Sequence, residues 1–125
     1  LLASSDSLVT VEMIQAVVLK SALILKIQVS NALVSAFAKH GQITQAYQIF
    51  REMSLRNLIS WNSIISGFQL NGFPEQSLEQ FSELLVSELR PNLYTLTIVL
   101  SACASISALR RGKQVHGYAI KFGFF

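Results

Sequence analysis

The chain repeats residues 31–53, NALVSAFAKHGQITQAYQIFREM, at residues 62–84, NSIISGFQLNGFPEQSLEQFSEL. With a shift of 31 residues, seven of the 23 aligned positions are identical, and most other pairs keep the size or polarity of the side chain. Self-similarity at a period of roughly 20–50 residues is typical of helical and other repeat proteins. The sequence therefore predicts an array of short, similar units.

The repeat continues beyond these two stretches. A further shift of 35 residues places Leu93 on Leu58 and Ser101 on Ser66. The apolar pattern near the end of the chain also resembles the pattern near its beginning, although few residues are identical there. The units predicted on this basis are residues 1–26, 27–57, 58–92 and 93–125, of which the first and the last are incomplete.

Each unit is predicted to form two helices. Ile64, Ile65 and Phe68 stand at helical spacing and make one apolar stripe, which favours a first helix from about residue 59 to 70. The following Asn-Gly pair ends that helix, and Pro74 suits the first turn of the next one. The apolar residues of that second helix are Leu78, Phe81, Leu84 and Leu85.

The same signals recur in the other units. In residues 27–57 the first helix is expected to reach Lys39, with a break at His40-Gly41 before the second helix. Residues 8–24 are expected to be the second helix of an earlier unit. The apolar spacing shows no strand alternation, so the prediction is an all-α solenoid, in which each unit packs on its neighbours.

Composition and charge limit the function classes. The chain has 125 residues, 51% of them apolar and 14% charged, so it can bury a core and is not a disordered segment. Its formal charge of +3 is compatible with a nucleic-acid partner without requiring one. Cys103 is the one cysteine, which excludes an internal disulfide and a zinc-finger ligand set. Polar residues interrupt every apolar run, so no membrane partner is predicted.

Catalytic motifs are absent from the sequence. A zinc deaminase needs His-x-Glu and Cys-x-x-Cys, but His40 is followed by Gly-Gln and His116 by Gly-Tyr. No glycine-rich phosphate loop and no Gly-x-Ser-x-Gly motif occurs. We therefore predict no catalytic residue, no metal, no cofactor and no small-molecule substrate.

Four phrases of the sequence carry a family resemblance. They are ISWNSIISGF at 59–68, NALV at 31–34, LSACA at 100–104 and GKQVH at 112–116. Together they resemble plant pentatricopeptide repeat proteins, and the tetratricopeptide pattern of Trp, Leu, Gly and Tyr does not occur. The units resemble the subfamily that alternates standard, long and short repeats: 1–26 a partial long form, 27–57 a short form, 58–92 a standard form, and 93–125 a truncated long form.

This resemblance implies a fold, a function and partners. The fold would be a right-handed α-solenoid of helix-turn-helix repeats. The function would be sequence-specific binding of single-stranded RNA, in support of RNA editing or another maturation step in an organelle, with editing or processing factors as further partners. The compartment would be the mitochondrion, with the chloroplast as the alternative, and any targeting peptide would lie outside this segment.

The resemblance also implies particular RNA-contacting residues. Such repeats read one base per unit through two or three side chains. The fifth and last residues of a unit would read the base: Asn31 with Asn57, Asn62 with Asn92, and Thr97 without its partner. A side-chain amide can donate and accept, as a Watson–Crick edge requires. An Asn–Asn pair would favour a pyrimidine. The second residues would stack on bases, namely Gln28, Ile59 and Tyr94, and Lys39 would contact phosphate.

Other interpretations of these residues stay open at this point. Asn57 and Asn92 stand beside predicted helix starts, where capping alone could explain them. Trp61 and Cys103 are better explained as core residues than as a stacking platform and a reactive thiol. The alternative function is a scaffold of tetratricopeptide-like helical repeats that binds another protein.

Overall fold

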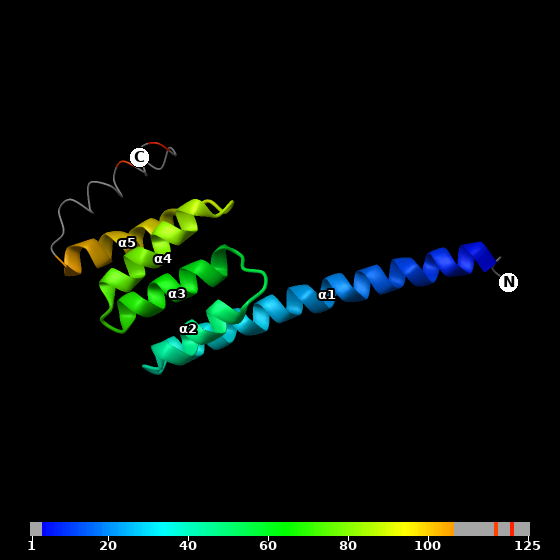
Figure 1. Cartoon of the computed structure of the whole chain (residues 1–125), viewed down its shortest axis with the longest axis horizontal. Coiled ribbons are helices and arrows are strands. Elements are labelled where there is room, and N and C mark those ends of the chain that lie inside the picture. Colours follow the sequence, from blue (N-terminus) through cyan, green and yellow to red (C-terminus); the bar gives the residue numbers. More distant parts are fainter. Residues whose placement is uncertain (1–3, 107–116, 118–120, 122–125) are drawn as a thin grey trace.

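The computed structural model describes residues 4–106, 117 and 121, and Figure 1 shows their arrangement. The helices run in the order α1 Ser4–Lys39, α2 Ile43–Glu52, α3 Leu58–Leu70, α4 Pro74–Val86 and α5 Leu93–Ser105. The described residues contain no strand. The predicted all-α helical-repeat fold is therefore confirmed. Most of the stretch predicted as the second helix of the last unit, with Gly112 and His116, lies outside the described residues.

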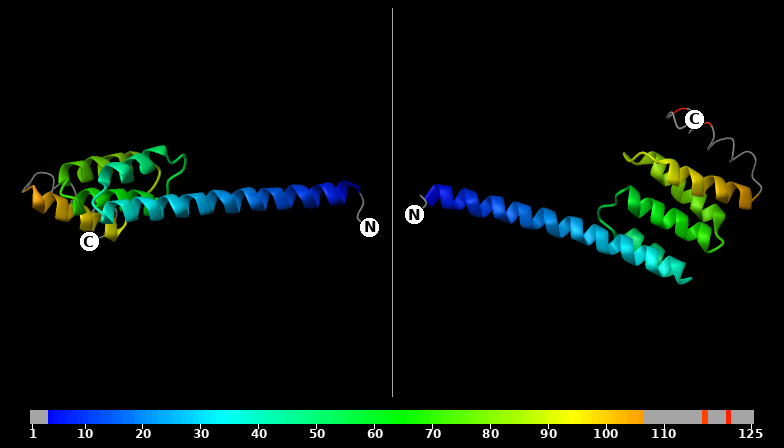
Figure 2. Two further views of the ribbon diagram at one scale, coloured as in Figure 1. Left: turned by 90° about the horizontal axis from the view of Figure 1, so that it is seen from below. Right: turned by 180° about the vertical axis from the view of Figure 1, so that it is seen from behind.

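The helices form two layers, which the left view of Figure 2 shows edge-on. One layer contains α3, α5 and the C-terminal part of α1. These lie side by side, because α3 contacts both α1 and α5. In the other layer α2 packs on α1 and α3, and α4 packs on α3 and α5. The first helices of successive units therefore line one face of the array, as a solenoid requires.

The prediction of a separate second helix over residues 8–24 was wrong. Residues 8–24 do not form a separate helix, because α1 is continuous over 36 residues. The repeat alignment places Lys26 and Val29 where later units have Asn57 and Ser60, so no capping pair starts a helix at residue 27. Residues 21–30 also contain no glycine or proline that would end one. The helix therefore runs on, and its side chains at 8–26 are exposed.

The N-terminal part of α1 extends away from the rest of the described chain, as all three views in Figures 1 and 2 show. By length and composition alone, Leu8–Lys39 is apolar enough to cross a membrane. A core helix of a soluble protein or a leader segment passes the same test, so this property does not identify a membrane span. The end of α1 has another role, because Val34 and Ala38 are buried in the core.

The core follows the predicted stripes. Ile64, Ile65 and Phe68 of α3 are buried, as are Phe50 of α2 and Phe81 of α4. Two small residues of the second helices, Ala46 of α2 and Ser77 of α4, are also fully buried. Cys103 is buried as well, which confirms its expected core position. Leu85 was expected on the apolar face of its helix but is about two-fifths exposed, because it lies at the edge of that stripe. Leu100 of α5 is exposed to the same extent.

An aromatic cluster joins the first complete unit to the second. Trp61 packs edge-on against Phe50 with ring centroids 4.9 Å apart, so the prediction of Trp61 as a core residue is confirmed. The guanidinium of Arg56 lies over the Phe50 ring at 4.4 Å, and its Nε donates to the Phe50 carbonyl at 2.9 Å. Arg56 thus holds the loop between α2 and α3 against the core.

The distance between α1 and α3 is set at their carboxyl ends. A Cβ atom added to Gly67 would lie 3.0 Å from Cβ of Ala38, so the two helices approach as closely as a glycine allows. The Asn71 amide nitrogen donates to the Ala38 carbonyl at 2.9 Å and to the Gly67 carbonyl at 2.8 Å. Both carbonyl groups also accept a backbone N–H, that of Ala38 from Gly41 and that of Gly67 from Asn71, so the Asn71 side chain adds a second bond to each. The two turns have the predicted glycines in the left-handed region, at Gly41 and Gly72.

Candidate functional site

An open groove lies between α1 and α3 and reaches α5, with a volume of about 340 Å³. Each of the three first helices supplies part of its wall. The lining residues are Ser35, Ala38, Lys39, Ile59, Asn62, Ser63, Ser66, Gly67, Leu70 and Tyr94. Four of the residues that the family resemblance selected, namely Lys39, Ile59, Asn62 and Tyr94, therefore meet in one groove.

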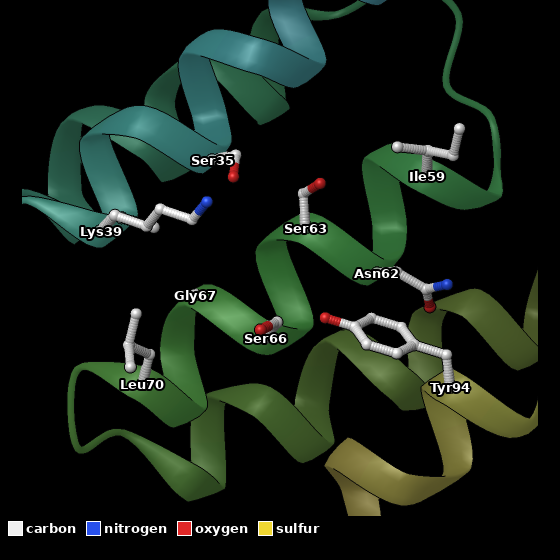
Figure 3. A pocket seen from close by; sticks show the side chains of 10 residues that line it. Ser35, Lys39, Ile59, Asn62, Ser63, Ser66, Gly67, Leu70 and Tyr94 are labelled. Carbon is white, nitrogen blue, oxygen red and sulfur yellow. The ribbon is translucent and has the colours of Figure 1, made fainter.

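The groove combines apolar, polar and cationic groups, which Figure 3 shows in place. Ile59 and Tyr94 are 62% and 57% exposed, so both present apolar surface to a ligand. The Tyr94 ring lies beside Asn62, and the Lys39 side chain extends from α1 toward Ser63 of α3. None of the described residues lining the groove is acidic. Such a surface suits a ligand with flat apolar faces and negative charge.

A closed network of hydrogen bonds surrounds Asn62. Its amide nitrogen donates to Oδ1 of Asn92 at 3.4 Å, and its Oδ1 accepts from the Thr95 hydroxyl at 2.5 Å. Asn92 is the N-cap of α5, where its Oδ1 accepts from the backbone N–H of Thr95 at 3.0 Å. In return, the backbone N–H of Asn92 donates to the Thr95 hydroxyl at 3.2 Å. The two predicted reading residues of this unit are therefore joined directly.

The same network occurs one unit earlier. Asn31 donates from its amide nitrogen to Oδ1 of Asn57 at 3.0 Å, and its Oδ1 accepts from the Ser60 hydroxyl at 2.5 Å. Asn57 caps α3 and forms a reciprocal capping box with Ser60. Asn57 and Asn92 are thus helix caps, as the alternative interpretation held, and each cap is also tied to the fifth residue of its own unit.

The network leaves part of each amide free. A side-chain amide has two N–H donors and an oxygen with two lone pairs. Asn62 uses one donor on Asn92 and one lone pair on Thr95, which leaves one of each. Asn62 is only 8% exposed, but it lines the groove. A ligand that enters the groove can therefore meet a free donor or a free acceptor of Asn62.

The remaining predicted residues lie elsewhere. Gln28 is exposed on α1 and does not line the groove. Thr97 is exposed on α5, and its hydroxyl donates back to the Leu93 carbonyl at 2.8 Å. Asn31 is buried at 7% exposure and is not among the residues that line the groove. The roles predicted for these residues stay predictions.

Sequence reasoning missed Ser60 and Thr95, although both hydroxyls contact predicted reading residues. Their positions carried a signal: the pattern Asn-x-x-Ser/Thr occurs at 57–60 and again 35 residues later, at 92–95. That pattern is typical of a helix N-terminus with a side-chain cap. It does not reveal that the hydroxyl also reaches an asparagine about one unit away.

The fold and the groove together define a class of protein, a helical-repeat protein whose first helices line an open groove. Comparison with known proteins identifies the repeats. The family model described as PPR repeat matches residues 29–58 and 59–89. These bounds lie within three residues of the two complete units predicted from the sequence. The chain belongs to the pentatricopeptide repeat family.

Curated relatives support the same family. One pentatricopeptide repeat-containing protein of Arabidopsis thaliana is 51% identical over 127 residues, which cover 100% of this chain and 17% of the relative. Another protein of that description from the same plant is 41% identical over 112 residues, covering 90% of this chain and 19% of the relative. The chain therefore spans less than a fifth of the length of either relative.

Proposed function

We propose that the chain binds single-stranded RNA and reads its sequence in the groove between α1, α3 and α5. The observation that carries this proposal is the position of Asn62. Its amide has a free donor and a free acceptor, and it lies in the groove with Ile59 and Tyr94. Proteins that read single-stranded RNA hydrogen-bond to base edges and stack on base faces. Membership of the pentatricopeptide repeat family supports the same function.

A base in the groove would have its faces and its edge contacted by different residues. Ile59 and Tyr94 are the second residues of successive units, so each would cover one face of the base between them. The Asn62 amide would then meet the Watson–Crick edge, with Asn92 behind it. All four bases present adjacent donors and acceptors on that edge, so the pyrimidine preference proposed for an Asn–Asn pair rests on the family resemblance.

The backbone of the RNA would lie along the α1 side of the groove. Lys39 provides the positive charge there for a phosphate. Ser35, Ser63 and Ser66 provide hydroxyls that can bond to phosphate or to the ribose 2′-hydroxyl. Because Leu70 stands one unit after Lys39, at the equivalent position, the charge does not recur and the attraction to phosphate is modest.

The affinity of this chain alone should be low. Two complete Asn–Asn pairs engage about two bases, each worth roughly 1–3 kcal/mol by stacking. The cost of association removes most of that free energy, which places the dissociation constant no tighter than about micromolar. In the cell the function would belong to a longer array, and we propose that the array serves RNA editing or another RNA maturation step in a plant mitochondrion or chloroplast.

A titration of fluorescently labelled RNA with the 125-residue chain tests the proposal. We expect binding of oligouridine and oligocytidine at low salt, and a Kd about tenfold weaker for the double variant Ile59→Ala/Tyr94→Ala, since each loses contact with a base. Val86→Ala is the matched control, because Val86 is exposed and apolar but lies on α4, away from the groove. No binding of any single-stranded RNA, or equal loss with the control, would contradict the proposal.

The scaffold remains the second candidate, and one observation favours it. The side chains of α1 between residues 8 and 26 are exposed although many are large and apolar. Exposed apolar surface of this kind commonly packs against protein. A scaffold would bind no RNA in the titration, and the groove variants would leave its binding of a protein partner unchanged.

A further inference from the structure

The side-chain amides of Asn31 and Asn62 each accept a hydrogen bond from a hydroxyl group of the following unit. Ser60 is the third residue of its unit and contacts Asn31 of the unit before, and Thr95 holds the same place relative to Asn62. We propose that Ser60 and Thr95 are positioning residues for base recognition, which determine how sharply each unit discriminates between bases. This inference rests on the proposed RNA binding.

The Thr95 hydroxyl has a single proton to donate. The hydroxyl oxygen accepts from the backbone N–H of Asn92, so one of its lone pairs is already occupied. Its proton can go to Oδ1 of Asn62 at 2.5 Å or to Oδ1 of Asn92 at 2.9 Å. The shorter distance favours Asn62, and Asn92 already accepts from the backbone N–H of Thr95 and from the Asn62 amide.

These bonds give the Asn62 amide one orientation. Oδ1 of Asn92 must be the acceptor, because it receives the N–H of Thr95 at the helix cap. If the Asn62 amide were turned over, its oxygen would face that of Asn92 without a proton between them. The Thr95 hydroxyl completes the arrangement by donating to Oδ1 of Asn62. The order of donor and acceptor presented to a base is therefore set by residues of the following helix.

Removing the hydroxyl should loosen this arrangement. Oδ1 of Asn62 would then lack its donor at a site that is 8% exposed, and a buried acceptor without a partner is unfavourable. The amide would rotate toward the groove to reach water, and its donor and acceptor would no longer hold one order. The consequence is a loss of discrimination between bases, with stacking on Ile59 and Tyr94 retained.

The test compares two double variants of the 125-residue chain. Ser60→Ala/Thr95→Val removes both hydroxyls, whereas the conservative swap Ser60→Thr/Thr95→Ser keeps both. Fluorescence anisotropy gives the Kd for short oligouridine, oligocytidine and oligoadenosine. We expect the wild-type chain to prefer pyrimidine by about tenfold, as a good bidentate contact allows. The preference should fall to about twofold or less without the hydroxyls and stay near the wild-type value in the swap.

A loss of stability alone would not explain that result. Ser77→Ala is the control for stability, because Ser77 is buried and its hydroxyl donates to the Ile65 carbonyl at 2.9 Å and not to a reading amide. We expect this variant to melt at a lower temperature and to keep the pyrimidine preference.

Two outcomes would overturn the inference, and they differ from each other. If the wild-type chain binds the RNAs with no preference or not at all, the proposed function fails and the positioning role with it. If the wild-type chain prefers pyrimidine and the variant without hydroxyls prefers it equally, RNA reading stands and Ser60 and Thr95 have only a structural role.

Discussion

The N-cap of α3 offers a sharp test of the hydrogen-bond network, through the change Asn57→Ala. Oδ1 of Asn57 accepts two bonds, from the Ser60 backbone N–H and from the Asn31 amide, each at 3.0 Å, while the Ser60 hydroxyl donates its proton to Asn31. Loss of an N-cap side chain costs about 1 kcal/mol. The change also leaves the buried Asn31 amide without its acceptor, which costs about 1 kcal/mol more. We therefore expect the free energy of unfolding to fall by about 2 kcal/mol.

Two further variants separate the contributions. Asn57→Asp keeps an acceptor oxygen at the same place and adds a negative charge at a helix N-terminus, so its free energy of unfolding should stay within about 1 kcal/mol of the wild type. Asn92→Ala removes the equivalent cap of α5, but the bond from the Asn62 amide is longer there, at 3.4 Å. We expect a smaller loss for Asn92→Ala than for Asn57→Ala.

Urea unfolding followed by far-ultraviolet circular dichroism measures these changes. A loss of about 2 kcal/mol should lower the midpoint by roughly 1 M for a typical slope of a small protein. The slope itself should not change, because the variants expose no additional surface on unfolding. A midpoint for Asn57→Ala that matches the wild type would refute the reasoning, as would an equal loss for Asn57→Asp.

Three further predictions concern the groove. Lys39→Gln should lower the slope of log affinity against log salt by about 0.7, the value for one phosphate of a single strand, in titrations over a salt series. Asn62→Thr with Asn92→Asp should move base preference from pyrimidine toward guanine, the base that the family resemblance implies for Thr with Asp. The free energy of unfolding should also fall by about 1 kcal/mol, because Asn62 is buried and hydrogen-bonded. Gly67→Ala should destabilise the chain by about 1 kcal/mol in urea, since a Cβ 3.0 Å from that of Ala38 outweighs the better helix propensity of alanine. An unchanged salt slope, base preference or midpoint would count against the respective prediction.

The parts of the fold that local signals specify were predicted from the sequence. Gly41 and Gly72 marked the turns, and Pro74 marked the start of α4. The predicted first helix over 59–70 differs by one residue from the observed α3. The separate helix over 8–24 was predicted from the repeat period alone, because no residue that ends a helix directly follows it in the sequence. Where the period and the local capping residues disagreed, the local residues decided the structure.

The candidate site was predicted less completely, for a physical reason. The periodic positions indicated Asn62, Ile59, Tyr94 and Lys39, and these residues do line one groove. A repeat alignment compares equivalent positions and therefore cannot show which different positions touch. The contact between Thr95 and Asn62 joins the third residue of one unit to the fifth residue of another, 33 positions apart. Contacts of that kind depend on how neighbouring hairpins pack.

Each reading amide is bonded to a hydroxyl of the following unit, and this contact across the unit boundary affects how such arrays can be recombined. A cassette cut at the repeat boundary, residues 27–57, carries Asn31 and Asn57 but leaves Ser60 behind. A cassette cut at residues 31–60 carries all three. A duplicated or transplanted unit therefore inherits part of its recognition from whatever follows it. Exchange of units, in evolution or in design, keeps the recognition site intact only when the junction falls inside the first turn of the next helix.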